Sequence, residues 1–171
     1  MRKAKVIFIM TALLLGSFNS VFATAQMPDI LIYEGKEESI FTNPLESYFG
    51  GEHPRPEGLF KFSCTANWRG YMATWEIKEG SLYLVKIVEG TCSMDAPEIP
   101  VSGIFPGKKA PVLADWYSGS LRIPQGELLS YTHMGYESVY EKELVLEIKS
   151  GKLVNKATVK NTAPGPVELE F

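Results

Sequence analysis

The sequence predicts an antiparallel all-β fold, a sandwich or a barrel, with at most one short helix. After residue 25, no apolar repeat with a period of 3.6 residues lasts longer than two turns. Instead, short runs rich in β-branched and aromatic residues recur, and glycine or proline turn signals separate them. Closely spaced turns of this kind are typical of sheets whose neighbouring strands follow each other along the chain.

The first strand is predicted at residues 29–33, before Gly35. Residues 36–60 are less regular, and they contain a Gly-Gly pair and prolines, which break strands and helices. We therefore expect an ordered loop there, held to the domain by its aromatic side chains. A short helix at residues 44–49 is compatible with this loop.

A β-hairpin is predicted in the middle of the chain. Residues 64–77 alternate between apolar and polar side chains, and the alternation changes phase at Gly70, as a β-bulge would produce. A turn at 78–81 then leads into a returning strand at 82–88. A two-residue loop at Glu79-Gly80 places apolar residues opposite each other in two pairs, Ile77 with Leu82 and Trp75 with Leu84.

Residues 89–111 are predicted to form a loop, because prolines and glycines are frequent there. The later strands are expected at residues 112–117, 120–123, 127–133, 139–148 and 153–160, with turns at 118–119, 124–126 and 150–151. In the last of these strands, Leu153, Ala157 and Val159 are expected on the inner face.

Residues 1–25 have the pattern of a cleavable secretory signal peptide. A basic start is followed by an apolar run over 6–15 and by small residues at Ala23 and Ala25. The alternative, a membrane anchor, needs about 20 apolar residues, and this run is shorter. No cysteine lies near the cleavage site, so we expect export to the periplasm or the extracellular space without a lipid anchor or stable membrane insertion.

The mature chain is expected to consist of one β-rich domain at 26–161 and a disordered tail at 162–171. Loss of the three basic residues of the signal changes the net charge from −3 to −6. An acidic chain lacks the basic surface that nucleic acids require, so no nucleic-acid partner is expected. No cofactor motif is present either, and no cofactor is expected.

The two cysteines, Cys64 and Cys92, both follow the signal. Export to an oxidising compartment favours a disulfide between them. Two free thiols or a nucleophilic cysteine are the alternatives, but neither cysteine has a candidate base beside it in the sequence.

His133 is the one candidate for general acid–base catalysis, oriented by Glu137 or another carboxylate. Neither a recognised nucleophile motif nor Gly-x-Ser-x-Gly surrounds it, so a packed or hydrogen-bonded histidine is the favoured interpretation. No metal site is predicted, because the chain has only two histidines and lacks the usual ligand spacings.

Aromatic residues spaced along strands usually belong to a core, but an exposed group beside polar residues can bind a sugar or a peptide. Trp68 and Trp116 are the candidates for exposure, because each has polar neighbours near a glycine. Structural ion pairs are expected for Arg69 with Asp115 and for Arg122 with a glutamate. The candidate binding residues are Trp68, Arg69, Tyr71, Asp115, Trp116, Tyr131, His133 and Tyr136.

Two stretches and a short cluster after them carry a resemblance to known sequences. They are Thr65–Tyr71 with Trp75–Ile77, Ala114–Gly119 with Leu121–Gly126, and then Tyr131, His133–Tyr136 and Tyr140–Glu141. Together these resemble a family of small uncharacterised bacterial proteins over residues 28–155. The resemblance implies a bacterial source and a single domain, and it assigns no activity.

Three functions fit the sequence. The favoured one is an exported, non-catalytic protein that binds a protein or glycan partner. The second is a hydrolase-like enzyme that uses His133 with a carboxylate. The third is an inhibitor of a secreted enzyme that presents one of the proline-rich loops, 53–56 or 95–111.

Overall fold

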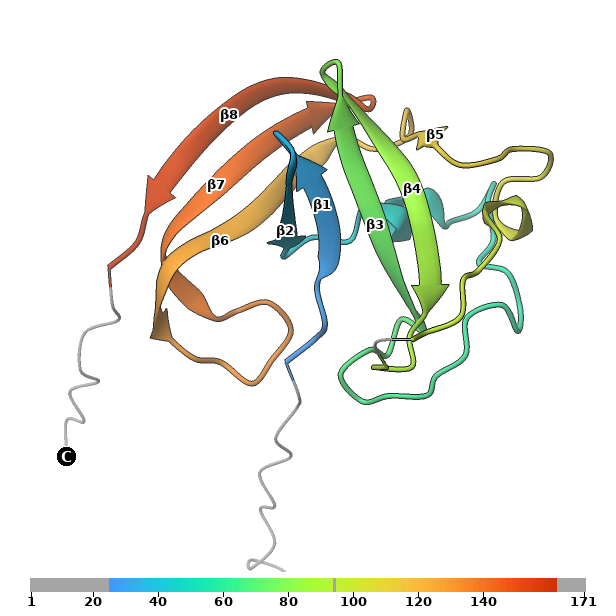
Figure 1. Cartoon of the computed structure of the whole chain (residues 1–171), viewed down its shortest axis with the longest axis horizontal. Coiled ribbons are helices and arrows are strands. Elements are labelled where there is room, and N and C mark those ends of the chain that lie inside the picture. The colour runs from blue at the N-terminus through green and yellow to red at the C-terminus, as the bar shows by residue number, and fades with distance from the viewer. Residues whose placement is uncertain (1–24, 94, 163–171) are drawn as a thin grey trace, which may run out of the picture.

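The structure, a computed structural model, describes residues 25–93 and 95–162. The predicted signal peptide, apart from Ala25, and the predicted tail after Thr162 lie outside the described residues. The strands are β1 (Asp29–Tyr33), β2 (Lys36–Ile40), β3 (Tyr71–Lys78), β4 (Ser81–Glu89), β5 (Val112–Leu113), β6 (Gly119–Ser130), β7 (Val139–Lys149) and β8 (Lys152–Lys160) (Figure 1). Two short 3-10 turns are η1 (Pro44–Tyr48) and η2 (Val101–Gly103).

The predicted all-β class is confirmed. The strands form one sheet in the order β2-β1-β3-β4-β8-β7-β6, and β5 pairs with β4. All pairs are antiparallel except β1 with β3, because the long connection through η1 returns β3 to the far side of β1. In the part of the chain that the structure describes, no helix is long and apolar enough to cross a membrane.

The expectation of a loop throughout 36–60 is wrong, because β2 lies within it. Glu34 and Gly35 adopt positive φ angles of 50° and 77°, which form a two-residue turn and direct β2 back along β1. The β2 sequence Lys-Glu-Glu-Ser-Ile has no apolar alternation that would reveal a strand. The short helix expected nearby is present as η1.

The central hairpin has the predicted register, with Ile77 opposite Leu82 and Trp75 opposite Leu84. The expected bulge at Gly70 is wrong, because residues before Tyr71 form a loop and the register shift lies between Thr74 and Trp75. Residues 124–126 likewise do not end a strand: β6 runs through them as one long edge strand, with a register shift after Gln125. An edge strand tolerates Pro124 because its missing N–H faces away from β7.

The inner face predicted for β8 is confirmed for Leu153, which packs against the core, and wrong for Ala157 and Val159. The register shifts by one residue between the pairs Glu147–Asn155 and Ile148–Leu153. Leu153 therefore shares a face with Ile148, whereas Ala157 and Val159 lie on the opposite, exposed face.

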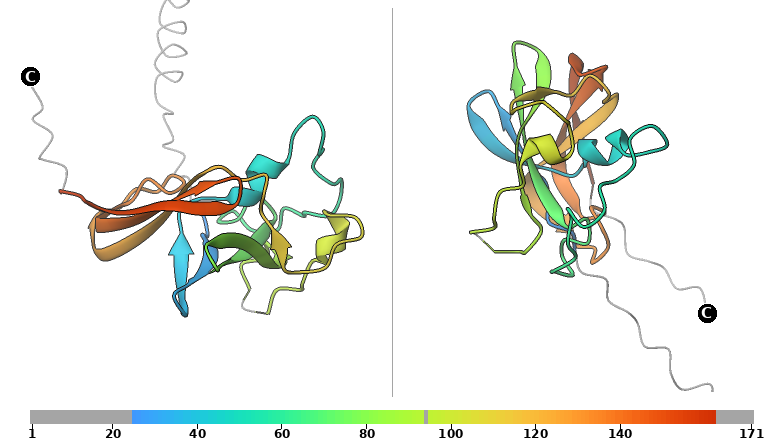
Figure 2. Two further views of the ribbon diagram at one scale, coloured as in Figure 1. Left: turned by 90° about the horizontal axis from the view of Figure 1, so that it is seen from above. Right: turned by 90° about the vertical axis from the view of Figure 1, so that its right-hand side faces the viewer.

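In the strand order, the two parts of the sheet, β2-β1-β3-β4 and β8-β7-β6, are joined where two hairpins turn. β4 pairs with β8 through Ser81 and Lys152 alone. The N–H of Leu82 donates to the Gly151 carbonyl (2.8 Å), and the N–H of Leu153 donates to the Gly80 carbonyl (2.9 Å). The β1–β2, β3–β4 and β7–β8 hairpin tips all lie at the same end of the molecule (Figures 1 and 2). The loop between β6 and β7 lies at the opposite end, together with the loops that follow η1 and β4.

Apolar side chains from both parts fill a common core, which includes Leu31, Tyr71, Trp75, Leu84, Leu121, Ile123 and Leu146. Tyr117 packs at its margin, and its hydroxyl donates to the Ser120 carbonyl (3.1 Å). Burial raises the pKa of Tyr117 to about 12.

The raised pKa predicts an alkaline loss of stability. An unfolded tyrosine ionises near pH 10, so Tyr117 contributes its full stability below pH 10 and loses it as the pH rises toward about 12. Replacing Tyr117 with phenylalanine should therefore reduce the fall in the free energy of unfolding between pH 10 and 12, as measured by urea titrations at each pH. Tyr131→Phe, at an exposed position, is the matched control and should leave that fall unchanged.

Candidate functional site

The two edges of the sheet meet at one point and then separate. The N–H of Phe41, just after β2, donates to the Arg122 carbonyl of β6 (2.8 Å). The Thr42 hydroxyl donates to the Ser120 carbonyl (3.1 Å) and accepts from the N–H of Arg122 (3.3 Å). The two segments thus run antiparallel here, because the residue numbers rise along one as they fall along the other.

Pro124 explains why the edges do not join further. Continuing this antiparallel register places Ser39 of β2 opposite Pro124 of β6. Proline has no N–H to donate, and β6 bulges immediately afterwards, between Gln125 and Leu128. The sheet therefore stays open along a seam that starts at Ser39 and Pro124.

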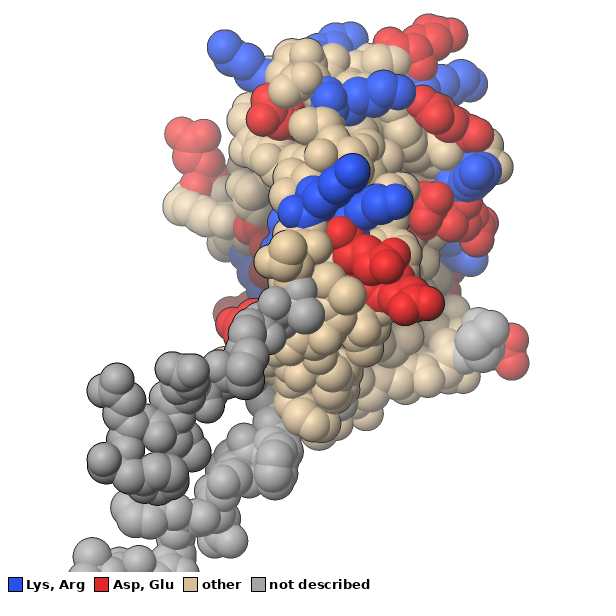
Figure 3. Space-filling view, turned by 90° about the vertical axis from the view of Figure 1, so that its left-hand side faces the viewer, with Lys and Arg blue, Asp and Glu red and all other residues tan. Residues whose placement is uncertain are grey.

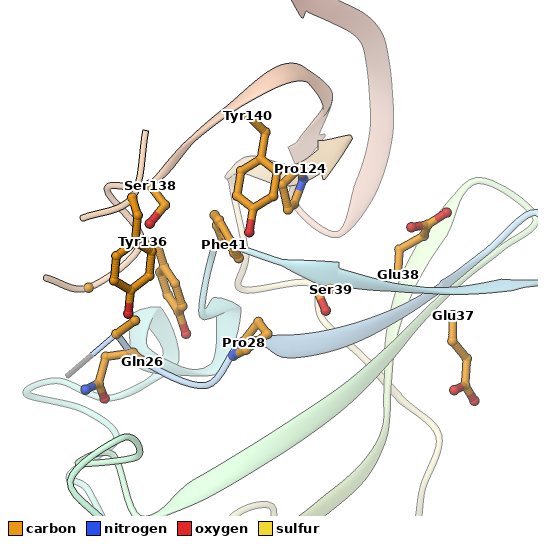
Figure 4. A pocket seen from close by; sticks show the side chains of 13 residues that line it. Gln26, Pro28, Glu37, Glu38, Ser39, Phe41, Pro124, Tyr136, Ser138 and Tyr140 are labelled. Carbon is orange, nitrogen blue, oxygen red and sulfur yellow. The ribbon is translucent and has the colours of Figure 1, made fainter. Parts of the chain in front are cut away.

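A cleft of about 500 Å³ occupies this seam (Figure 4). At one end lie three aromatic rings: Phe41 stacks on Tyr136 with centroids 5.1 Å apart and meets Tyr140 edge to face at 5.8 Å. Along β2, Glu37 and Glu38 point to opposite sides of the strand. The lining residues are Ala25, Gln26, Pro28, Glu37, Glu38, Ser39, Phe41, Pro124, Tyr131, Gly135, Tyr136, Ser138 and Tyr140.

A buried polar network fixes Tyr136 at the end of the cleft. Its hydroxyl accepts hydrogen bonds from the Arg69 guanidinium (2.7 Å) and the Asn43 amide (3.1 Å), and it donates to the Met27 carbonyl (2.9 Å). Arg69 also donates to the Met27 carbonyl (3.0 Å). This network joins the N-terminal segment, the loop before β3 and the loop between β6 and β7.

Asp29 is the anion of the network and is completely buried. Its carboxylate accepts from Arg69 (3.3 Å), from the Ala73 N–H (3.2 Å) and from the Trp75 indole (3.1 Å). Burial raises the pKa of Asp29, and the Arg69 charge and the hydrogen bonds oppose that rise. The carboxylate thus depends on Arg69 for its stability in the core.

Arg55 holds the loop after η1 against this network. Its guanidinium donates to both carboxylate oxygens of Glu46 (2.8 Å each) and to the Arg69 carbonyl. It also lies over the rings of Phe60 and Tyr71, at 4.7 and 5.6 Å from their centroids. The Tyr71 hydroxyl donates to Glu46 (2.7 Å), so these contacts hold the loop before β3 against the network from outside the cleft.

Exposed apolar side chains form a rim near the cleft. Trp68 is 71% exposed, Tyr131 56% and Met134 54%. Gln26 lies between their loops: its side chain donates to the Thr65 carbonyl (3.2 Å) and accepts from the Trp68 N–H (3.3 Å), and its backbone N–H donates to the Gly135 carbonyl (3.3 Å). Figure 3 shows that the lower part of one face, at the level of the β6–β7 loop, is mostly uncharged, whereas charged side chains gather above it.

The disulfide predicted between Cys64 and Cys92 is present. It joins the loop that carries Trp68 to the chain just after β4, next to the hydrogen bond from the Ser63 hydroxyl to the Gly90 carbonyl (3.0 Å). Trp68 is therefore exposed on a loop that is fixed from both sides.

The predicted binding residues fall into three groups. Trp68, Tyr131, His133 and Tyr136 lie on the two loops that Gln26 joins, whereas Arg69 and Tyr71 are buried beneath them. Asp115 and Trp116 do not line the cleft. The exposure expected for Trp116 is wrong, because its ring packs on Tyr48 and Phe105.

Of the two predicted ion pairs, one is present. Arg122 binds Glu143 through two hydrogen bonds of 2.9 and 2.7 Å. The pair of Arg69 with Asp115 is wrong: Arg69 instead binds Asp29. The sequence feature that indicates the Arg69–Asp29 pair is the aspartate at the start of an apolar strand, since a buried carboxylate requires a counter-charge. Glu37 and Glu38 could not be predicted as cleft residues, because the β2 sequence lacks the apolar alternation typical of a strand.

His133 and Glu137, the catalytic candidates, are both exposed, and the His133 ring meets Tyr131 edge to face at 4.6 Å. The neighbouring Ser138 hydroxyl donates to the Thr132 carbonyl (3.2 Å) and accepts from the Thr132 N–H (3.1 Å), so it stabilises the loop. Among the described residues, no group of three or more histidine, cysteine or carboxylate side chains could hold a metal ion.

Comparisons with protein-family models, with curated proteins and with solved structures find no match to this chain.

Proposed function

We propose that the protein is an exported, non-catalytic binding protein whose binding site is the cleft between β2 and β6. The observation that carries this proposal is the combination of an open seam, an aromatic end and exposed rim residues. Ligand sites are typically concave, with apolar walls and a few polar groups that fix orientation. The cleft meets this description, with three packed rings and two carboxylates in its lining.

The fixed positions of Tyr136 in the cleft and of the Trp68 loop at its rim support the same proposal. Tyr136 is fixed by Arg69 and Asn43, and the Trp68 loop is fixed by the disulfide and by Gln26. A site that is already ordered loses little conformational entropy when its ligand binds. Two neighbouring loops with exposed aromatic residues thus extend the contact area without the cost of ordering them.

Binding can be tested on immobilised glycan and peptide arrays with the purified protein. We expect Tyr140→Ala to weaken a bound ligand about tenfold or more, because the ring lines the cleft and contacts Phe41. Asp115→Ala is the control at an exposed position outside the cleft and should leave the affinity unchanged. A ligand whose affinity is insensitive to Tyr140 and Tyr131 would contradict the assignment of this site.

Export is the second part of the proposal, and it is supported by the pattern of residues 1–25 and by the disulfide. When the full chain is expressed in a bacterium, the mature protein should begin at Gln26 and appear outside the cytoplasm. N-terminal sequencing of the periplasmic and culture fractions measures this directly. A chain that keeps Met1 in those fractions would contradict cleavage, and an Ala23→Tyr variant should accumulate uncleaved.

A further inference from the structure

The free edge of β2 faces the cleft, and this identifies the class of ligand. β2 is the first strand of the sheet order, so no strand among the described residues pairs with its outer edge. The cleft lining includes Glu37, Glu38 and Ser39, which make up most of that edge. We propose that the ligand is an extended, basic polypeptide segment that adds to β2 as a further strand. This inference rests on the proposed function, because it uses the same cleft.

The register of the β1–β2 hairpin shows which backbone groups are available. Tyr33 and Lys36 flank the two-residue turn, so they form a hydrogen-bonded pair, and such pairs alternate along the strands. Lys36, Glu38 and Ile40 thus direct their backbone groups toward β1. Glu37 and Ser39 direct their N–H and C=O groups outward, into the seam.

Phe41 confirms this alternation independently. It is the next residue of the same parity, and its N–H leaves the hairpin to donate to the Arg122 carbonyl (2.8 Å). The hydrogen-bonded ladder between this segment and β6 therefore starts at Phe41 and stops at Pro124. The outward groups of Ser39 and Glu37 are the next positions of that ladder. A peptide strand in the seam can bond to both residues, which is the mode of recognition by strand addition.

The charges along the edge favour a basic segment. Glu37 and Glu38 point to opposite sides of β2, so an added strand meets a carboxylate on either face (Figure 4). Among the described residues that line the cleft, none is basic. Successive side chains of a strand alternate between faces, so lysine or arginine on either face finds a partner, and an apolar side chain finds Tyr136 and Tyr140. Acidic edge residues also discourage pairing between copies of this chain.

The test uses a capped hexapeptide of alternating lysine and valine, with NMR of the purified exported protein. Addition of the peptide should shift the amide signals of Glu37 and Ser39 and slow the hydrogen exchange of both. The same peptide with alternate amides N-methylated keeps its side chains but loses its donors along one edge. We expect its affinity to be lower by about tenfold for each hydrogen bond that is lost.

Two variants of one residue provide the matched control. Ser39→Pro removes the outward N–H and leaves the β1 pairing intact, because Ser39 does not bond to β1 in this register; it should weaken the peptide about tenfold. Ser39→Ala keeps the N–H, so it should weaken the peptide much less than Ser39→Pro does. If Ser39→Pro does not fold, as judged by circular dichroism, the comparison with the N-methylated peptide alone tests strand addition.

Three results would overturn the inference. Equal affinities of the N-methylated and parent peptides would contradict strand addition. The absence of any amide shift at Glu37 and Ser39 at millimolar peptide would contradict it too. If the protein binds chitotetraose and not the peptide, and Tyr140→Ala abolishes that binding, strand addition is contradicted but the cleft remains the proposed binding site. The proposed function fails separately if every ligand from the arrays is insensitive to Tyr131 and Tyr140.

Discussion

Replacing Arg69 with leucine should lower the free energy of unfolding by about 3–5 kcal/mol, because the substitution leaves a buried carboxylate without its counter-charge. Asp29 is completely buried, and the remaining hydrogen bonds from Ala73 and Trp75 do not neutralise it. The loss should be measurable by urea denaturation at pH 7. It should be smaller at acidic pH, because the protonated Asp29 carboxyl needs no counter-charge, and burial raises its pKa.

A double-mutant cycle separates the charge effect from lost packing. Asp29→Asn in the Arg69→Leu background should recover part of the stability, because it removes the unpaired charge and keeps an acceptor for the Trp75 indole. The exposed pair of Lys156 with Glu34 is the matched control, and Lys156→Met should cost far less stability than Arg69→Leu. Equal losses for the buried and the exposed pair would contradict the role given to Arg69.

Removing the disulfide has the second large expected effect. The Cys64→Ala/Cys92→Ala variant should be less stable by about 3–4 kcal/mol, since the crosslink closes a loop with a sequence separation of 28 residues. Thermal unfolding in the presence and absence of a reducing agent measures the same quantity: the parent protein should lose stability on reduction, and the variant should not.

The disulfide also predicts a local effect at the rim. Without it, the loop around Trp68 depends on hydrogen bonds: Met27 N–H to the Ala66 carbonyl (2.7 Å), Gly90 N–H to the Gly70 carbonyl (2.9 Å), and the bonds of Gln26 and Ser63. Exchange of the Trp68 amide with solvent should therefore quicken in the double-alanine variant, whereas exchange at Leu146 in the core should change only in proportion to global stability. Unchanged protection at Trp68 would show that the loop does not depend on the crosslink.

Local features of the fold could be predicted from the sequence, whereas its long-range pairings could not. The register of Trp75 with Leu84 follows from a two-residue turn and from apolar alternation, and both signals lie within ten residues of each other. The parallel pairing of β1 with β3 depends on a connection of about thirty residues whose path no local pattern specifies. β2 was missed because its buried face contributes little more than Ile40.

The candidate site could be predicted only in part, because it too combines local features with long-range pairings. Trp68, Tyr131 and Tyr136 stood out by residue type, and the two loops that carry them are neighbours in the structure. The prediction of Asp115 as the partner of Arg69 is wrong, because Asp29 and Asp115 are equally plausible partners until the strand order is known. The seam itself arises from Pro124 facing Ser39, and this juxtaposition of opposite sheet edges has no signature in the sequence.

The hydrogen bond between Tyr136 and Met27 spans 109 residues, and it has a consequence for how the chain reaches its native state. Non-local contacts form late, because the entropy of closing a long loop must be overcome first. β1 pairs at once with β2, but the polar partners of this segment lie far along the chain: Asp29 binds Arg69 and Trp75, and Met27 binds Tyr136. The polar network around Asp29 and Met27 can therefore be completed only after Tyr136 has been synthesised.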